Sequence, residues 1–550
     1  MKIKIVDFFS VETNVLRMSV IYMAILSGCC YGSLIFIINH ATNILFMNAS
    51  AEIYLIIMYV LLCITFYGCQ KYSIVRAINI STQIIGQVRM RLIDKIRQSE
   101  LRFIENKGPS DIHLRITQDF KTISQSVPIL IASFEDFVTV IVVYLYIALI
   151  SFKAFIVIVS FISGIMIYFY SHYFYIKDEV KQAGLKEATF FDRLNDVLKG
   201  FKQIKIHSKK NDDLFNDIDR VAKESENYKV KGLTAYRQLT MNIALIQFIM
   251  YGTILFVMPI YFEELRLSIL KIFAAILFAS GPLEMFFRAF ALVAITNTSV
   301  DNLVQLEKEL DETPKQRVDP DEIPKDFHTI SLQDVSFQYK DKQGELTFQI
   351  GPIDLDIGKG EIVFIVGGNG SGKSTLLKLI TGLYFPLRPG KILLDNETID
   401  KQTYAGYRNL FSIIFTDYYL FKKLYGLKDV DENKVKEMLK TMLLNKKTNY
   451  KHNQFTNTNL STGQRKRLAC IDALLEDKPI YIFDEWTADQ DPLFREFLYD
   501  TILQDLKKAG KTIIVVSHDD RYFNRADTLI TLEDGKIQKV AKVAYENKTD

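Results

Sequence analysis

The stretch Ile362–Thr375 reads Ile-Val-Phe-Ile-Val-Gly-Gly-Asn-Gly-Ser-Gly-Lys-Ser-Thr, and the rest of the chain can be placed around it. The β-branched run Ile362–Val366 predicts a buried strand, and Leu376–Ile380 predicts a helix. The residues between them fit G-x-x-x-x-G-K-[ST], the phosphate-binding loop, in the strand-to-helix setting that this motif requires. A chance glycine turn is the alternative, but it would not place so many specific residues together.

Each residue type in this loop has a chemical reason. The glycines let backbone N–H groups converge on phosphate oxygens, Lys373 can reach the β- and γ-phosphates, and Ser374 can ligate Mg²⁺. We therefore predict binding of a nucleoside triphosphate with Mg²⁺. The predicted phosphate-binding residues are Gly367, Gly368, Asn369, Gly370, Ser371, Gly372, Lys373, Ser374 and Thr375.

Composition divides the chain into two unlike halves. Its 550 residues exceed the ~250–300 at which a single core stops growing, so more than one domain is expected. Long apolar runs occur almost entirely before about residue 300, whereas the chain after about 330 has the composition of a soluble α/β domain. A net charge of +3 gives no field that favours nucleic acid, and we predict no nucleic-acid partner. The five cysteines lack metal or disulfide spacing and are interpreted as small apolar fillers.

The first half predicts a membrane domain. Its apolar runs approach or exceed the ~18–20 residues that a bilayer core requires, and the first run is too long for a signal peptide, so it is predicted to be an uncleaved span. The long segments 70–127 and 176–238 are rich in Lys and Arg, unlike the short loops between the other spans, so both termini are predicted to be cytoplasmic. The six predicted spans are 17–39, 51–69, 129–150, 153–175, 239–261 and 269–296.

The two cytoplasmic segments show helical periodicity and are interpreted as extensions of the spans that could carry motion between the two halves. Residues 310–327 hold three prolines and many charges and are predicted to be a linker. The predicted domains are therefore 1–309, an all-α six-span transmembrane domain with coupling helices, the linker 310–327, and an α/β ATP-binding domain over 328–550.

Ionisable residues inside spans are costly, at least ~2.5–3.5 kcal/mol each at mid-bilayer. Glu284 and Arg288 lie four residues apart in the sixth span. They either line a substrate cavity, or form an internal ion pair or lie near the cytoplasmic end of the helix. Glu135 and Asp136 in the third span pose the same choice, and there the helix could enter the membrane only after them.

The second half supplies the other residues of an ATPase. Pro479–Glu485 is an apolar strand that ends in two carboxylates, of which Asp484 suits Mg²⁺ and Glu485 suits the base that polarises the attacking water. His518 follows the strand-like run Thr512–Val516, at the end where α/β sheets place ligands. Ser461, Gly463 and Gln464 open a helix and predict a second anion site. One ATP cannot use two γ-phosphate sites of one chain, so a second copy should supply one of them.

These motifs together resemble an ATP-binding cassette (ABC) transporter, and the six spans with long cytoplasmic helices resemble a type I exporter half-transporter. The resemblance implies two ATP molecules between two cassettes, each bound by one chain's phosphate loop and the other's Ser461–Gln464. It also implies that Tyr339 stacks on adenine, unless it is an ordinary strand aromatic, that Asp491 contacts the partner cassette and that His518 senses the γ-phosphate.

Two stretches narrow the resemblance. Asp484–Pro492 and Ser517–Phe523 are similar to the bacterial cyclic-peptide and siderophore exporters, including pyoverdine, syringomycin and microcin exporter-like proteins. Most cassettes carry glutamine where Thr416 stands. A threonine side chain reaches less far toward Mg²⁺ or the attacking water, so the role of Thr416 in coupling ATP hydrolysis to transport stays open. Thr462 stands where the family usually has glycine, whereas the neighbouring motif residues Ser461 and Gly463 are present.

We therefore predict an ATP-driven exporter of a peptide-like or siderophore-like substrate in a bacterial inner membrane. Its partners would be a second half-transporter, most simply a copy of itself, and membrane lipid. The alternatives are a lipid flippase or multidrug exporter of the same fold, and a nucleotide-gated receptor or immunity protein that does not pump. The spans argue against a soluble DNA-repair ATPase with a similar motif.

Overall fold

The computed structural model describes residues 16–46, 53–266, 268–313, 326–341, 343–400, 403–427 and 430–543. The predictions for the N-terminal residues 1–15 and for most of the linker, 314–325, concern residues outside these ranges. The chain separates into two compact units. We call Met1–Ile93 with Ser110–Lys308 the membrane unit, and Asp94–Pro109 with Glu309–Asp550 the nucleotide unit.

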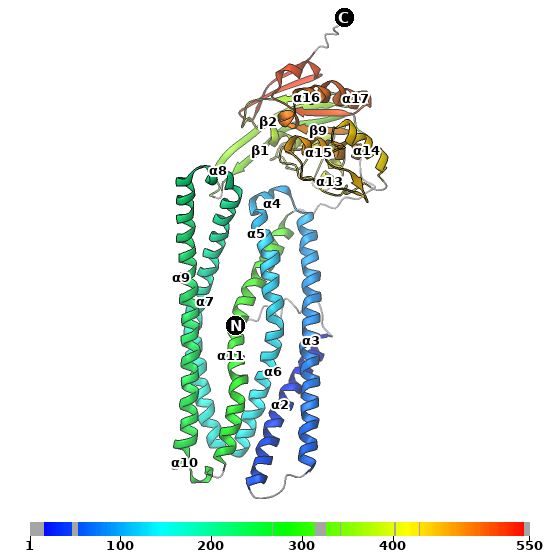
Figure 1. The fold of residues 1–550 in the computed structure, drawn as a ribbon. Coiled ribbons are helices and arrows are strands. Elements are labelled where there is room, and N and C mark those ends of the chain that lie inside the picture. The colour runs from blue at the N-terminus through cyan, green and yellow to red at the C-terminus, as the bar shows by residue number, and fades with distance from the viewer. Residues whose placement is uncertain are drawn as a thin grey trace. The chain divides into compact units, whose positions relative to one another are not determined.

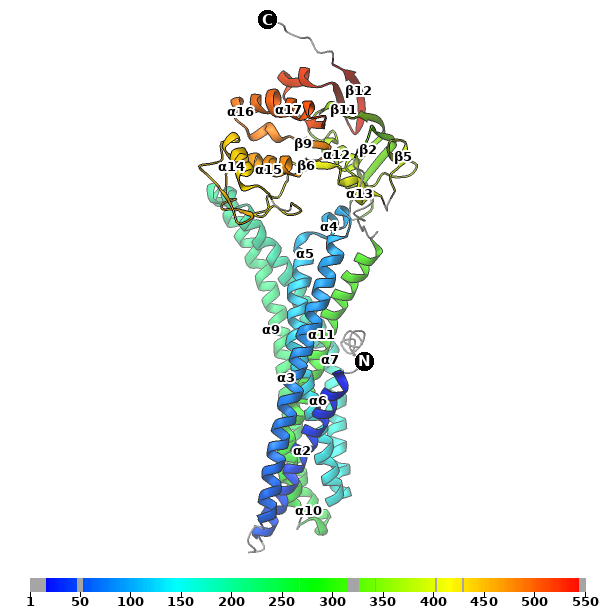
Figure 2. The same cartoon turned by 90° about the vertical axis from the view of Figure 1, so that its right-hand side faces the viewer.

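Six helices of the described residues are long and apolar enough to cross a membrane, which confirms the predicted spans. Several continue well beyond the apolar stretch, as the periodicity of the cytoplasmic segments predicts, and Figures 1 and 2 show them as long rods. The six are α2 (Leu16–Phe46), α3 (Ile53–Arg97), α6 (Phe120–Ile150), α7 (Phe152–Lys199), α9 (Ser208–Gly252) and α11 (Ile269–Glu312). Shorter helices are α5 (Pro109–Leu114), α8 (Phe201–Ile206) and α10 (Met258–Tyr261).

Helices α2 and α6 pack closely because α2 presents glycines to its neighbour. A Cβ atom on Gly28 would lie 2.7 Å from the Glu135 carbonyl oxygen and 2.8 Å from the Val138 Cβ. One turn on, a Cβ on Gly32 would lie 2.5 Å from Val142 Cγ1. Small residues four apart let helix backbones approach in this way, where lipid tails offer no hydrophobic drive for association. This contact fixes where α6 places its carboxylates.

Replacing Gly28 by Ala is expected to destabilise the membrane unit by about 1–3 kcal/mol, the usual cost of overpacking. The added methyl group meets backbone, which cannot rotate away. Thermal unfolding of the purified full chain would measure the effect. Gly164→Ala is the matched control, because a Cβ at Gly164 meets no atom within 4 Å. Equal melting temperatures for the two variants would contradict the close packing.

The nucleotide unit contains a mainly parallel sheet and an antiparallel one. The first has the strand order β12-β11-β3-β10-β9-β6, and the second β2-β1-β4-β5. Strands β1 and β2, which precede the phosphate loop, pair antiparallel, with an irregular register between Leu332 and Val335. The strands are β1 (Thr329–Lys340), β2 (Leu346–Gly358), β3 (Ile362–Val366), β4 (Lys391–Leu394), β5 (Glu397–Thr398), β6 (Phe411–Ile414), β9 (Ile480–Asp484), β10 (Thr512–Val516), β11 (Thr528–Glu533) and β12 (Lys536–Lys542), with a small hairpin of β7 (Tyr450–Lys451) and β8 (Gln454–Phe455).

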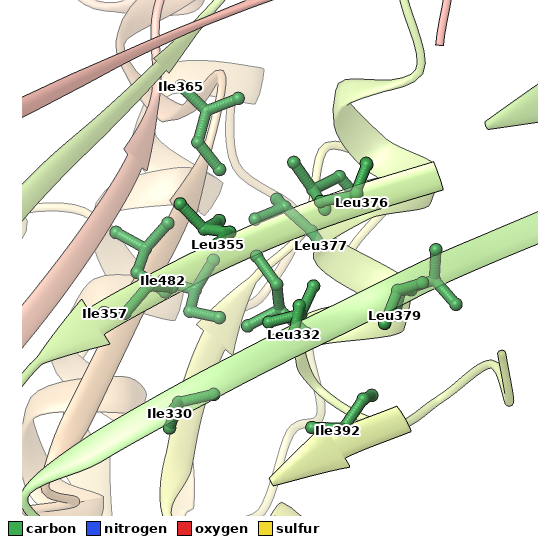
Figure 3. Close-up of a cluster of buried hydrophobic side chains, with 14 of the residues drawn as sticks. Ile330, Leu332, Leu355, Ile357, Ile365, Leu376, Leu377, Leu379, Ile392 and Ile482 are labelled. Carbon is green, nitrogen blue, oxygen red and sulfur yellow. The ribbon is translucent and has the colours of Figure 1, made fainter. Parts of the chain in front are cut away.

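Helix α12 (Lys373–Ile380) lies in the core between these sheets. Its leucines point toward side chains of β1, β2, β3 and β9, as Figure 3 shows for Leu376, Leu377 and Leu379. The other helices of the unit are α4 (Leu101–Lys107), α13 (Tyr404–Arg408), α14 (Glu432–Thr441), α15 (Thr462–Glu476), α16 (Pro492–Phe497) and α17 (Leu503–Lys508). Strands β3, β9 and β10 are buried along their whole length and run parallel, so their carboxyl ends lie at one edge of the sheet.

Helix α4 belongs to the nucleotide unit although it precedes it by more than 200 residues in the sequence. Its Glu105 forms an ion pair with Lys378 of α12, at 2.9 Å, and accepts a hydrogen bond from the Tyr384 hydroxyl. The guanidinium of Arg102 lies 5.3 Å from the centre of the Phe337 ring. The segment after α3 is therefore attached directly to the helix that follows the phosphate loop.

Candidate nucleotide site

The phosphate loop adopts the backbone that its glycines allow. Gly370 and Gly372 have φ angles of +80° and +101°, a region that favours glycine. A Cβ on Gly367 would lie 2.1 Å from the carbonyl oxygen of Leu532, so only glycine fits there. Gly368, Asn369 and Gly370 are exposed at the end of β3. The loop therefore offers backbone N–H groups to solvent at the carboxyl edge of the sheet, where α/β folds bind ligands.

Lys373 is almost fully buried and its ammonium group folds back onto the loop. It donates to the carbonyl oxygens of Gly367 and Gly368 at 3.0 and 2.9 Å. Its Nζ is also 3.9 Å from the Glu485 carboxylate. The cation thus lies in the concave face of the loop and beside the predicted base.

Asp484 and Ser374 form a pair suited to a divalent cation. Ser374 Oγ lies 3.4 Å from Asp484 Oδ2, whereas the buried Asp484 Oδ1 has no hydrogen-bond partner among the described residues. Burial is the largest cause that raises the pKa of the Asp484 carboxyl, and hydrogen bonding from Thr416 and Ser374 opposes it. Thr416 Oγ1 donates to the Asp484 carbonyl oxygen at 3.3 Å. The threonine at the usual glutamine position therefore contacts the end of β9 directly.

Glu485 lies just beyond β9 with a left-handed backbone, φ +46°. A non-glycine residue in this region costs roughly 1–3 kcal/mol, and such strain is common at functional sites. Its Oε1 lies 3.1 Å from Nε2 of His518, which follows β10, the strand next to β9. The structure thus brings together Lys373, Glu485 and His518 from three neighbouring strand ends.

Helix α15 begins at the predicted second anion site, and its first turn packs closely against the segment that follows Glu485. Ser461 N donates to Gln464 Oε1 at 3.3 Å, and Ser461 itself is exposed. A Cβ on Gly463 would lie 2.5 Å from the Asp489 carbonyl oxygen. The glycine is therefore required for this close approach, as well as for the motif.

Three residues that sequence reasoning missed strengthen this attachment. The buried Lys466 donates to the Glu485 carbonyl oxygen at 3.0 Å and pairs with Asp489 at 2.7 Å. Trp486 Nε1 in turn donates to the Lys466 carbonyl oxygen at 2.9 Å. Gln490 Nε2 donates to the Gly463 carbonyl oxygen at 3.0 Å. Trp486 and Gln490 lie in Asp484–Pro492, and the similarity of this stretch to cyclic-peptide and siderophore exporters was the only signal for them.

Asp491 and Tyr339 already have partners within the chain. The Asp491 carboxylate caps α16 by accepting from Phe494 N at 2.9 Å, and it pairs with Arg467 at 2.5 Å. The Tyr339 hydroxyl lies 3.3 Å from both Thr375 Oγ1 and the Tyr384 hydroxyl. Adenine stacking by Tyr339 and a partner contact by Asp491 stay predictions.

Comparison with known proteins agrees with this geometry. Residues 18–283 match the model of the ABC transporter transmembrane region, and residues 350–488 match that of the ABC transporter. The chain is 32% identical over 488 residues to the ATP-binding protein SyrD of Pseudomonas syringae pv. syringae, which covers 85% of each protein. The chain belongs to the ABC transporter family. This ABC transporter is a multi-pass membrane protein that hydrolyses ATP.

Two further comparisons bear on the kind of ABC transporter. A bacterial Atm1-family ABC exporter with ATP bound has a TM-score of 0.79 to this chain, at 17% identity and 96% coverage of each, which shows a shared fold. The ATP-dependent lipid A-core flippase 1 of Colwellia psychrerythraea is 31% identical over 261 residues, 44% of this chain and 42% of that protein. The fold of the whole chain is thus that of an ABC exporter, whereas the similarity to the flippase covers less than half of each protein.

In the membrane unit Glu284 and Arg288 form the expected internal ion pair and also lie beside a cavity. Arg288 Nη2 and Glu284 Oε1 form an ion pair at 2.6 Å, and both residues also line a cavity. Glu135 and Asp136 line the same cavity. Contact with substrate is not established by this placement and stays a prediction.

Proposed function

We propose that this ABC exporter moves a peptide-like or siderophore-like substrate out of the cytoplasm across a bacterial inner membrane, with both termini cytoplasmic. The substrate class is supported by the similarity of Asp484–Pro492 and Ser517–Phe523 to cyclic-peptide and siderophore exporters, together with the similarity to SyrD over 85% of both chains. The flippase similarity covers only 44% of this chain and 42% of that protein, so it gives weaker support for a shared cargo.

The nucleotide chemistry of the proposal uses residues that the sheet edge gathers. The loop around Gly370 and the Lys373 ammonium would bind the phosphates. The Glu485 carboxylate, with His518 beside it, would accept a proton from the attacking water. Asp484 and Ser374 would hold Mg²⁺, since the unpartnered Asp484 Oδ1 and an exposed hydroxyl suit a cation that keeps waters and phosphate oxygens as its other ligands. Bound Mg²⁺ would neutralise phosphate charge.

The working form would be a dimer, most simply of two identical chains. Ser461 is exposed at the start of α15, so its hydroxyl and the N–H groups after it are accessible to a nucleotide held by another chain. Closure of two such units around ATP could act on the membrane unit through α4, whose Glu105 is bound to Lys378 and Tyr384. Thr416, which contacts the end of β9, would report the state of the site in place of a glutamine.

ATP-dependent uptake into inverted membrane vesicles tests the substrate class. We expect a labelled cyclic peptide to accumulate in vesicles that contain the protein, and a labelled lipid A precursor not to be translocated. Vesicles with Glu485→Gln are the control for coupling. Translocation of the lipid alone would establish the flippase alternative, and ATP hydrolysis with no transport of any of these probes would favour a receptor.

A further inference from the structure

A half-open cavity of about 400 Å³ lies in the membrane unit between α2, α3, α6 and α11. This volume is at the low end of the ~300–1,000 Å³ of small-molecule sites. It would hold one side chain or head group and not a whole cyclic peptide. Three carboxylates and one guanidinium line it, from Glu135, Asp136, Glu284 and Arg288.

Glu135 is the most deeply buried of these charged groups, with 4% of its surface exposed. Its Oε1 accepts a hydrogen bond from Ser73 of α3, whereas Oε2 has no partner within hydrogen-bond distance among the described residues, with the side chains of Ser27 and Gln70 nearby. The buried hydroxyl of Ser27, which also lines the cavity, lacks a partner as well. Burying an unpaired polar atom is costly, and in membrane helices such groups mark functional sites.

The charge of the cavity is not balanced by its own residues. Arg288 is paired with Glu284, at 2.6 Å, which leaves Glu135 and Asp136. Within the described ranges, no Lys or Arg forms an ion pair with either of them. A cation that donates a hydrogen bond would balance these two carboxylates and pair with the free oxygen of Glu135.

We propose that this cavity is a subsite for a single ammonium group, bound by Glu135 with Asp136 beside it. The proposal rests on the proposed export function. It names the substrate feature that this function leaves open, an amine-bearing side chain of a peptide-like cargo or the head group of an aminolipid. Gly28 of α2 lies close to the backbone of Glu135, and Ser73 of α3 donates a hydrogen bond to its carboxylate.

Binding of dansylcadaverine, a fluorescent primary amine, tests the subsite in the full-length protein without ATP. We expect saturable binding in nanodiscs of phosphatidylglycerol, and binding weaker by about tenfold or more for its N-acetylated derivative, which keeps the shape and lacks the charge. Glu135→Gln should remove this difference, and Asp136→Asn should reduce it. Glu264→Gln is the matched control, since Glu264 pairs with Lys153 and does not line the cavity.

Three results of these binding measurements would contradict the ammonium subsite. Equal binding of the amine and its acetyl derivative, no saturable amine binding up to about 1 mM, or a difference that survives Glu135→Gln would overturn the subsite. Loss of amine binding in nanodiscs of phosphatidylethanolamine would support it and assign the ammonium group to a lipid, whereas retention assigns it to cargo. Peptide uptake without amine discrimination would refute the subsite alone, and amine discrimination without transport would refute only the export function.

Discussion

Replacing Glu485 by Gln is expected to lower ATP turnover by roughly 10²–10⁴-fold, the usual contribution of a general base, while ATP still binds. Glutamine keeps the size of the side chain and its contact with His518, but its amide cannot accept a proton from water. The Lys373 ammonium, 3.9 Å from the carboxylate, loses a neighbouring anion and stays held by Gly367 and Gly368. Phosphate release and binding of a fluorescent ATP analogue, measured on the same purified protein, separate the two effects.

Glu437→Gln on the exposed side of α14 is the matched control, and we expect it to keep wild-type turnover. If Glu485→Gln retained more than about a tenth of the activity, another group would have to act as base. If it lost nucleotide binding as well, the role of Glu485 would be structural. In that case its left-handed backbone and the Lys466 contact would be the features to examine.

The nucleotide site could be predicted from the sequence because its motifs are local. Each one is a strand with the residues that follow it, and parallel strands bring these ends to one edge. The contacts between α15 and the segment that follows β9 could not be predicted in the same way. Lys466 contacts Glu485 and Asp489 across about 20 residues, and nothing in the spacing singles out a buried lysine. The role of Trp486 is visible only in the structure, where its ring N–H donates to the Lys466 carbonyl oxygen.

In the membrane unit the spans could be predicted from the sequence, but the surroundings of individual residues could not. Length and hydropathy predict six spans well, because the bilayer sets both. The environment of Glu135 depends instead on how α2, α3 and α6 pack, and sequence reasoning favoured a position outside the membrane core for it. The two glycines of α2 were the available signal, since spacing of four brings helices into close contact. The helical periodicity that predicted an extension of the second span also gave no sign that α4 would group with the nucleotide unit.

A dimer of two different variants tests whether two chains share each nucleotide site. In a dimer with Lys373→Ala in one chain and Ser461→Arg in the other, we expect ATP turnover at least about tenfold above that of either variant alone. The Ser461→Arg chain supplies an intact phosphate loop, and the Lys373→Ala chain supplies an intact Ser461, so one composite site is complete. The other site carries both defects. Co-expression with two affinity tags and sequential purification would give this mixed dimer for measurement of phosphate release.

The decisive control carries the same two substitutions in one chain, paired with a wild-type chain. If each nucleotide is bound by Lys373 of one chain and Ser461 of the other, both sites of this control are defective, and turnover should stay at the level of the single variants. If instead each chain binds its nucleotide alone, the wild-type chain remains intact, and the order of the two dimers reverses. The comparison therefore separates a shared site from a self-contained one without any assumption about how far a single site can drive transport.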